Sequence, residues 1–320
     1  MKIDLREHLE FVHGVAEVAP GARGLRLNRM TPAALKTCEI AETRMLRGRC
    51  CSGVRIRFDS DTRAVTLKLG LGIGEARPVY TTDVVVDGET TLTFGADSAG
   101  QDYDVQVAAP GPGKHRYEIH LPHLCESEVL GLEVDDGASL APAAYPGEAI
   151  IFIGDSITQG MTTTSPARAY ATRLAAALDR DFTNLSVGGA QMDEALGAAA
   201  LAYQWGSAYV AYGINDWSSK RPLEEFARQT RGMLRNLSSR PGAKIRIITP
   251  LPFVRPITDP HPNTVDDFRQ CIRDVAAEFP GVQIIEGPSL MPAEERLFID
   301  GLHPNDDGMQ AMAESLLALH

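Results

Sequence analysis

The sequence has little of what marks membrane proteins, secreted precursors and nucleic-acid-binding proteins. No apolar run approaches about 18 residues, so no membrane-spanning helix is predicted. Residues 1–8 lack the apolar segment of a signal peptide, and a cytoplasmic location without a membrane partner is therefore expected. Lys and Arg number 31 against 42 Asp and Glu, giving a formal net charge of −11. Because nucleic-acid binding needs a basic surface, no nucleic-acid partner is expected.

Cysteine and metal-binding patterns are also scarce. The five cysteines are Cys38, Cys50, Cys51, Cys125 and Cys271. Their number is odd and their spacing does not match a zinc site, so neither a disulfide framework nor a metal is predicted. Histidines outside the motif discussed below, such as His120 and His123, show no ligand spacing, and most are expected at the surface. A glycine-rich phosphate loop is missing too, and no cofactor is expected.

Residues 1–145 have the period-two pattern of half-buried β-strands. Apolar and polar residues alternate over 54–58 and again over 65–69, and the connection at 59–62 suits a short hairpin. Asp87-Gly88 lies between two further runs and predicts a second hairpin. Short strands at this spacing are typical of a β-sandwich or jelly roll.

Residues 146–320 have a different pattern. The apolar run at 149–153 is typical of a parallel strand buried on both faces. Similar runs recur at 208–211, 245–248 and 282–285, and helical patterns cover 169–178, 224–237, 265–279 and 307–319. This alternation predicts an α/β fold with an open parallel sheet and right-handed crossovers. The sequence therefore predicts an all-β accessory domain followed by an α/β domain, with the boundary near residue 145.

A polar loop follows the first strand of the second half. Residues 154–160 read Gly-Asp-Ser-Ile-Thr-Gln-Gly. Catalytic groups of open α/β sheets lie at the carboxyl ends of strands, and flanking glycines let the chain turn tightly. Ser156 is thus either a nucleophile or part of the cap of the next helix. The Gly-x-Ser-x-Gly elbow of α/β-hydrolases is absent.

Four motifs resemble, in order, the sequence blocks of the SGNH or GDSL-type hydrolases. They are residues 154–156 (GDS), 184–189 (NLSVGG), 212–216 (YGIND) and 300–305 (DGLHPN). Each stands beside a predicted strand end or before the last predicted helix, and four blocks in order are far more specific than any one of them. The N-terminal half looks like the β-sandwich that precedes the catalytic domain in some two-domain members.

The resemblance implies a catalytic triad. Ser156 would be the nucleophile, His303 the base that takes its proton, and Asp300 the carboxylate that orients the base. These residue types suit the chemistry, because a serine hydroxyl is a poor nucleophile at neutral pH without a base. An imidazole titrates near that pH, and a carboxylate fixes its tautomer.

The resemblance also implies an oxyanion hole. Its donors would be the N–H groups of Ser156 and Gly189 and the side-chain amide of Asn215, with Gly188 open as the alternative to Gly189. Further candidates to line the pocket are Gln159, Met161, Asp216, Trp217 and Phe253. Trp217 and Phe253 are at least as well suited to the core.

The sequence therefore predicts a serine ester hydrolase, and its resemblance to two-domain members favours a short-chain acyl or acetyl esterase of a carbohydrate or small metabolite. The same triad would serve an acyltransferase, and a non-catalytic carbohydrate-binding protein is the alternative outside enzymes. The oligomeric state is not indicated.

Overall fold

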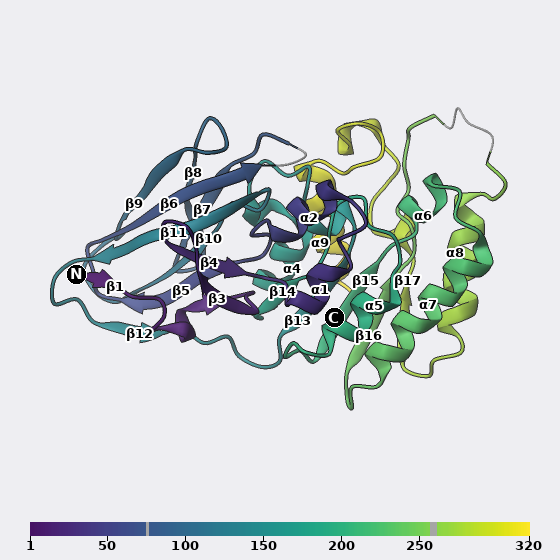
Figure 1. The fold of residues 1–320 in the computed structure, drawn as a ribbon, viewed down its shortest axis with the longest axis horizontal. Helices are drawn as coiled ribbons and strands as arrows, with labels where there is room; N and C mark the ends of the chain where they lie inside the picture. The colour runs from purple at the N-terminus through teal and green to yellow at the C-terminus, as the bar shows by residue number, and fades with distance from the viewer. Residues whose placement is uncertain (75–76, 257–260) are drawn as a thin grey trace.

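The computed structural model describes residues 1–74, 77–256 and 261–320. Figure 1 shows its two parts: a pair of antiparallel sheets at the N-terminal end, and a parallel sheet flanked by helices. Within the described ranges, no helix is both long and apolar enough to cross a membrane.

Two antiparallel sheets form the N-terminal sandwich. The first has the strand order β3-β4-β11-β6-β9, with β1 paired to β11, and the second has the order β12-β5-β10-β7-β8, with β2 paired to β5. The first comprises β1 (Lys2–Ile3), β3 (Glu17–Pro20), β4 (Leu25–Asn28), β6 (Ala64–Gly74), β9 (Asp102–Ala108) and β11 (Cys125–Val134). The second comprises β2 (Val12–His13), β5 (Arg55–Ser60), β7 (Thr81–Val86), β8 (Glu89–Gly95), β10 (His115–His120) and β12 (Leu140–Pro142).

The alternating residues of these strands form the sandwich core. Leu67 and Leu69 of β6 and Ile56 and Phe58 of β5 are fully buried in one cluster. Alternate side chains of a strand point to the same face, so each strand contributes every second residue to the space between the sheets. The predicted β-sandwich is confirmed.

One predicted hairpin is confirmed and one is wrong. β7 and β8 pair through the turn at Asp87 and Gly88, which have φ of 54° and 89°. Positive φ at both central residues matches the twist of the flanking strands. By contrast, β5 pairs with β10 and β6 pairs with β11, so the connection at 59–62 passes from one sheet to the other. The alternation of a strand does not specify its partner.

The C-terminal sheet is parallel and has the order β14-β13-β15-β16-β17. Its strands are β13 (Ile150–Gly154), β14 (Phe182–Asn184), β15 (Ser207–Ala211), β16 (Lys244–Ile248) and β17 (Val282–Ile285). The apolar runs of the sequence predict β13, β15, β16 and β17, whereas β14, only Phe-Thr-Asn, has no such run. All residues of the interior strand β13 are buried, as expected of a strand covered on both faces.

Helices cover both faces of this sheet. One face packs against α5 (Glu194–Ala200), α7 (Leu223–Ser238) and α8 (Val265–Ala276), and the other against α4 (Tyr170–Ala177) and α9 (Asp306–Leu317). Two short helices, α3 (Ser156–Gln159) and α6 (Ile214–Ser218), follow β13 and β15. Single 3₁₀ turns lie at Leu9–Phe11, Pro166–Arg168, Gly287–Ser289 and Glu295–Leu297. The predicted α/β fold is confirmed.

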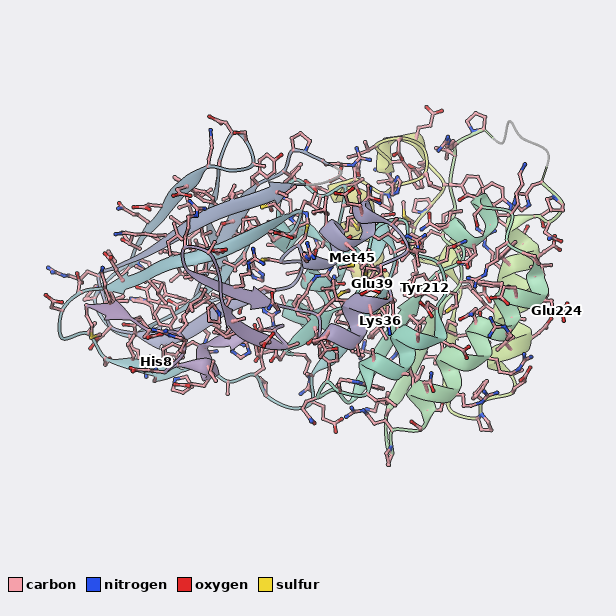
Figure 2. The ribbon with its side chains drawn as sticks, in the orientation of Figure 1. His8, Lys36, Glu39, Met45, Tyr212 and Glu224 are labelled. Atoms are coloured by element: carbon pink, nitrogen blue, oxygen red, sulfur yellow. The ribbon has the colours of Figure 1, made fainter. Side chains whose placement is uncertain are left out.

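Two N-terminal helices, which the β-pattern does not predict, lie at the junction of the two parts (Figures 1 and 2). They are α1 (Pro32–Lys36) and α2 (Glu42–Arg49). Ala34 and Cys38 belong to the same buried cluster as Leu185 and Val187 of the α/β part. Residues before position 145 therefore complete the core of the parallel sheet, and a domain boundary at that position stays a prediction.

Candidate active site

Ser156 begins α3, directly after the interior strand β13. Asp155 caps this helix, because its Oδ1 accepts a hydrogen bond of 3.0 Å from the Ile157 N–H. A Cβ at Gly154 would lie 2.8 Å from the Ala211 carbonyl oxygen and 2.5 Å from Thr158 Oγ1. Only glycine therefore fits where β13, β15 and α3 meet, and this close packing fixes the start of the turn that carries Ser156.

His303 and Asp300 lie on the loop before α9. His303 Nε2 lies 2.9 Å from Ser156 Oγ, and His303 Nδ1 lies 2.9 Å from Asp300 Oδ2. The loop is held in place by hydrogen bonds from the Ile299 N–H to the His303 carbonyl, 2.9 Å, and from the Val254 N–H to the Gly301 carbonyl, 2.8 Å. The structure thus brings the serine, the histidine and the carboxylate together in a hydrogen-bonded series.

The Asp300 carboxylate is held in its ionised form. Partial burial opposes ionisation, but hydrogen bonds from the His303 N–H (2.8 Å) and the Leu302 N–H (3.2 Å), together with the imidazole, outweigh it and lower the pKa of Asp300 to about 2. Arg77 from the sandwich places Nη2 3.2 Å from Asp300 Oδ2. A negative charge beside Nδ1 therefore persists at neutral pH.

The segment 184–189 runs beside β13 toward Ser156. The Val187 N–H donates to the Gly154 carbonyl at 3.0 Å, and the Gly188 N–H donates to Gln159 Oε1 at 2.7 Å. The N–H groups of Gly189 and Ser156, by contrast, have no acceptor within residues 1–74, 77–256 and 261–320. Of the two candidate glycines, Gly189 is the one whose N–H is available.

Asn215 lies on α6, after the strand on the other side of β13. Its Nδ2 donates to the Ala190 carbonyl at 3.0 Å. An amide nitrogen carries two protons, so this bond orients the group and leaves the second proton to donate elsewhere. The second motif starts at the end of β14 and the third follows β15, and these strands are the two neighbours of β13. The two motifs therefore lie on either side of the Ser156 turn.

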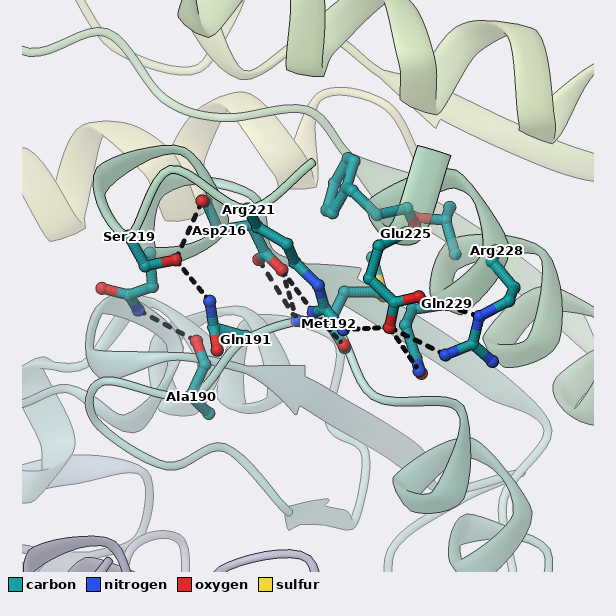
Figure 3. A network of polar contacts seen from close by, with 12 residues as sticks. Ala190, Gln191, Met192, Asp216, Ser219, Arg221, Glu225, Arg228 and Gln229 are labelled. Carbon is teal, nitrogen blue, oxygen red and sulfur yellow. Dashed lines mark hydrogen bonds and ion pairs between the residues drawn. The ribbon is translucent and has the colours of Figure 1, made fainter. Parts of the chain in front are cut away.

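A buried polar network holds the chain after Gly189 (Figure 3). Asp216 accepts from the Met192 N–H at 3.2 Å and from Arg221 Nη1 at 2.7 Å, and Arg221 Nη1 also donates to the Met192 carbonyl at 2.8 Å. Burial raises the pKa of Asp216, although the Arg221 guanidinium opposes the shift. Asp216 thus holds the loop through the Met192 N–H and Arg221, which motif spacing alone does not indicate.

The remaining candidate pocket residues have mainly packing contacts. Met161 packs on Gly188, where a Cβ would lie 1.9 Å from its Sδ. The Trp217 and Phe253 rings lie 5.5 Å apart, and Trp217 Nε1 donates to the Asn263 carbonyl at 3.1 Å. Gln159 is fully buried, and its Oε1 accepts a hydrogen bond from the Gly188 N–H.

The expectation that most histidines lie at the surface is wrong for His120 and His123. His120 is buried against Glu118, with Nε2 3.1 Å from its Oε1. His123 is buried at the junction of the two parts, with Nε2 3.0 Å from both the Gly160 carbonyl and Thr163 Oγ1. Each polar contact satisfies a ring nitrogen that a surface position would expose to water.

Two cavities lie in or near the α/β part. One of about 200 Å³ lies beside the end of the segment 184–189, with Arg44, Ala190 and Tyr212 in its wall. A cleft of about 880 Å³ separates the second sandwich sheet from α4, and its lining does not include the serine, the histidine or Asp300. Among the described residues, no group of three or more His, Cys, Asp or Glu side chains could hold a metal ion.

The fold is shared with several solved structures. A salicylyl-acyltransferase from a tetracycline biosynthetic pathway is 20% identical over 96% of this chain and 94% of its own, with a TM-score of 0.86. A putative GDSL-like lipase from Bacteroides ovatus is 18% identical over 95% of this chain and 93% of its own, with a TM-score of 0.77. A family two carbohydrate esterase from Clostridium thermocellum, solved in complex with cellohexaose, is 19% identical over 84% of this chain and 92% of its own, with a TM-score of 0.65.

The sequence itself matches a family model. Residues 152–311 match the model of the GDSL-like lipase/acylhydrolase family, and this range contains all four motifs. A search of curated proteins finds no match. Because the family model covers half of the 320 residues, this chain belongs to the GDSL-like lipase/acylhydrolase family, a family of ester hydrolases.

Proposed function

We propose that this protein hydrolyses short-chain acyl esters, acetyl esters first, of a carbohydrate or small metabolite, with Ser156 as nucleophile. The observation that carries the proposal is the hydrogen-bonded series from Ser156 Oγ to His303 Nε2 and from His303 Nδ1 to Asp300. A serine, an imidazole and a carboxylate in this order are the constellation that activates a hydroxyl for acyl transfer.

In the proposed reaction, His303 takes the Ser156 proton as Oγ attacks the ester carbonyl. The tetrahedral intermediate collapses when His303 gives that proton to the departing alcohol. Water then attacks the acyl-serine by the same route, with His303 again as base, and releases the carboxylic acid. Asp300 stabilises the imidazolium in both steps, and its pKa of about 2 keeps it charged throughout the neutral range.

The oxyanion of each tetrahedral intermediate would receive hydrogen bonds from the N–H groups of Ser156 and Gly189 and from the second proton of Asn215 Nδ2. These donors are already oriented before substrate binds, since Ala190 holds the amide and the Gly189 loop is anchored. One such donor contributes about 3–4 kcal/mol to transition-state stabilisation.

The substrate class is supported by fold analogy. The carbohydrate esterase complex shows that this architecture can serve a carbohydrate-directed esterase, and the loops at 161–165 and 218–222 are rich in small polar residues. The test is a panel of p-nitrophenyl esters from two to sixteen carbons, together with acetylated sugars. We expect kcat/KM to be highest for the two- to four-carbon esters. A kcat/KM that rises steadily beyond eight carbons would instead indicate a lipase or thioesterase.

Transfer to an alcohol is the second candidate. It is favoured by the likeness to the salicylyl-acyltransferase, which extends through the sandwich and covers nearly all of both chains. Hydrolase and transferase differ in whether water or an alcohol reaches the acyl-serine. Product analysis with an added alcohol acceptor at constant water separates them, since a transferase gives mostly the new ester at millimolar acceptor.

A further inference from the structure

Two arginines from the N-terminal part contact the backbone at the proposed oxyanion hole. Arg47 Nη1 donates to the Gly188 carbonyl at 2.9 Å, and Arg44 Nη2 donates to the Gly189 carbonyl at 2.6 Å. Both side chains come from α2, more than 140 residues earlier in the chain. Each bond joins a guanidinium to a carbonyl oxygen, the stronger, charge-assisted kind.

The contact with Gly188 fixes the direction of the Gly189 N–H. These two groups belong to one peptide unit, and in a planar trans peptide the C=O and the following N–H point in opposite directions. While Arg47 holds the carbonyl toward α2, the Gly189 N–H must point away from α2. A rotation of this unit would bring the carbonyl oxygen round in place of the donor and would break the Arg47 bond.

This peptide needs an external anchor because both of its residues are glycines. Gly189 has a φ of 76°, a conformation that glycine adopts freely but can also leave freely. A Cβ there would lie 3.2 Å from Arg47 Nη1, so the guanidinium also covers the position where a side chain would restrict the backbone.

The anchor is itself rigid. Gln159 links α2 to the same loop, because its Oε1 accepts from the Gly188 N–H while its Nε2 donates to the Arg47 carbonyl at 3.0 Å. Arg29, also buried, donates to the Arg47 carbonyl at 2.8 Å. The next residues are held as well, because the Ala190 carbonyl accepts from Asn215 Nδ2 and the Met192 N–H donates to Asp216, which is labelled in Figure 3.

We propose that Arg47, assisted by Arg44, is a positioning residue that keeps the oxyanion hole formed through the Gly188–Gly189 peptide. The N-terminal segment carrying α2 is then part of the catalytic apparatus, beyond any accessory role in binding. The inference rests on the proposed function, in which the Gly189 N–H is a donor to the oxyanion.

The test compares Arg47→Met and Arg47→Lys with Arg49→Met in the full-length protein. Arg49 is the matched control, because it lies on the same helix but pairs with Glu126 on the sandwich. For Arg47→Met we expect kcat to fall by about 100-fold with KM changed less than threefold, the loss typical of one oxyanion donor. Arg47→Lys should recover part of kcat, millimolar guanidinium should partly rescue Arg47→Ala, and Arg49→Met should match the wild type.

Several results would overturn the inference. A well-folded Arg47→Met enzyme with wild-type kcat removes it, and a rise in KM alone makes Arg47 a substrate-binding residue. Loss of the folded state in both Arg47→Met and Arg47→Lys, judged by melting temperature, assigns the residue to the fold instead. The proposed function fails separately, through Ser156→Ala: if that variant turns over normally, the triad is wrong whatever Arg47 does.

Discussion

At the scale of single residues, most polar groups of the candidate site are held by hydrogen bonds within the protein. The hydroxyl, the imidazole and Asp300 form one series, and the Gly188 N–H, the Gly188 carbonyl and the Gly189 carbonyl are all engaged. Within the described residues, the N–H groups of Ser156 and Gly189 have no acceptor, and the Asn215 amide keeps a second proton besides the one that binds the Ala190 carbonyl. These three groups are the donors proposed for the oxyanion.

Asp300→Asn tests the orientation of the base. An asparagine in the same place donates toward Nδ1 or leaves it unpaired, so His303 loses the tautomer that accepts the serine proton at Nε2. We expect kcat to fall by up to about 10⁴-fold, while the fold is retained. Steady-state kinetics give the value, and Arg77→Met is the control. The Arg77 pair is partly exposed and should matter less than tenfold. Full kcat in Asp300→Asn would mean that another group orients the histidine.

Asn215→Ala tests the oxyanion hole. The amide would meet charge that develops only in the transition state, so we expect kcat to fall by about 100-fold with little change in KM. Separate determination of kcat and KM on one acetyl ester decides between two roles. An effect confined to KM would make Asn215 a residue that binds the substrate in its ground state.

The four motifs could be recognised from the sequence because each is a short local pattern. The contacts of Arg44 and Arg47 with the segment 184–189 could not, since each donates to a peptide carbonyl more than 140 residues away, and a peptide carbonyl leaves no mark in the residue type. Gln159 lies in the polar loop 154–160, yet its contact with Gly188 depends on β13 and β14 being neighbours. Its role therefore becomes visible only in three dimensions.

At the scale of elements, strands were easier to predict than their partners or the helices near the N-terminus. The alternation at 54–58 and 65–69 correctly indicates strands, but the two belong to different sheets. α1 and α2 are short, and α2 is mostly polar, with two of its arginines, Arg44 and Arg47, donating to backbone carbonyls. An amphipathic pattern is the usual sign of a helix, and here it is too weak to detect.

The junction of β13, β15 and α3 gives a prediction about stability. In Gly154→Ala the new methyl group would meet the Ala211 carbonyl, a backbone atom that cannot move aside without disturbing β15. We expect the free energy of unfolding to fall by about 1–3 kcal/mol, the range for overpacking. Gly111→Ala is the control, as its Cβ would meet nothing within 4 Å and its φ is not positive. Equal urea midpoints for the two variants would contradict this view of the turn.

At the scale of the whole molecule, the sandwich and the α/β part share buried contacts around the site. α1 contributes to the α/β core, α2 contacts the segment 184–189, and His123 binds the turn after α3. Such contacts cross long stretches of sequence, so the pattern of either half cannot reveal them. The two halves are therefore expected to unfold together.

His123 makes this junction sensitive to pH. Burial lowers the pKa of His123 to about 4, against about 6.5 in an unfolded chain. Below pH 6.5 the unfolded state binds a proton that the folded state excludes, so the stability from neutral His123 is complete above 6.5 and is lost as the pH falls toward 4. We expect a loss of up to about 3 kcal/mol over this interval.

Urea unfolding of the wild type and His123→Asn between pH 7 and 4.5 measures this loss. The variant has no group that titrates in this interval at that position, and its stability should depend less steeply on pH. The same slope in both proteins would show that other groups govern the acid sensitivity.

The central claim is that Ser156 is a nucleophile activated by His303, and covalent labelling tests it most directly. A fluorophosphonate is attacked by an activated serine, and intact-mass and peptide analysis locate the adduct. We expect one adduct on Ser156 in the wild type, none in Ser156→Ala, and labelling at least about 100-fold slower in His303→Ala, with folded protein in each case and esterase activity lost in step. An adduct on another residue, or normal ester turnover by purified Ser156→Ala, would contradict the claim.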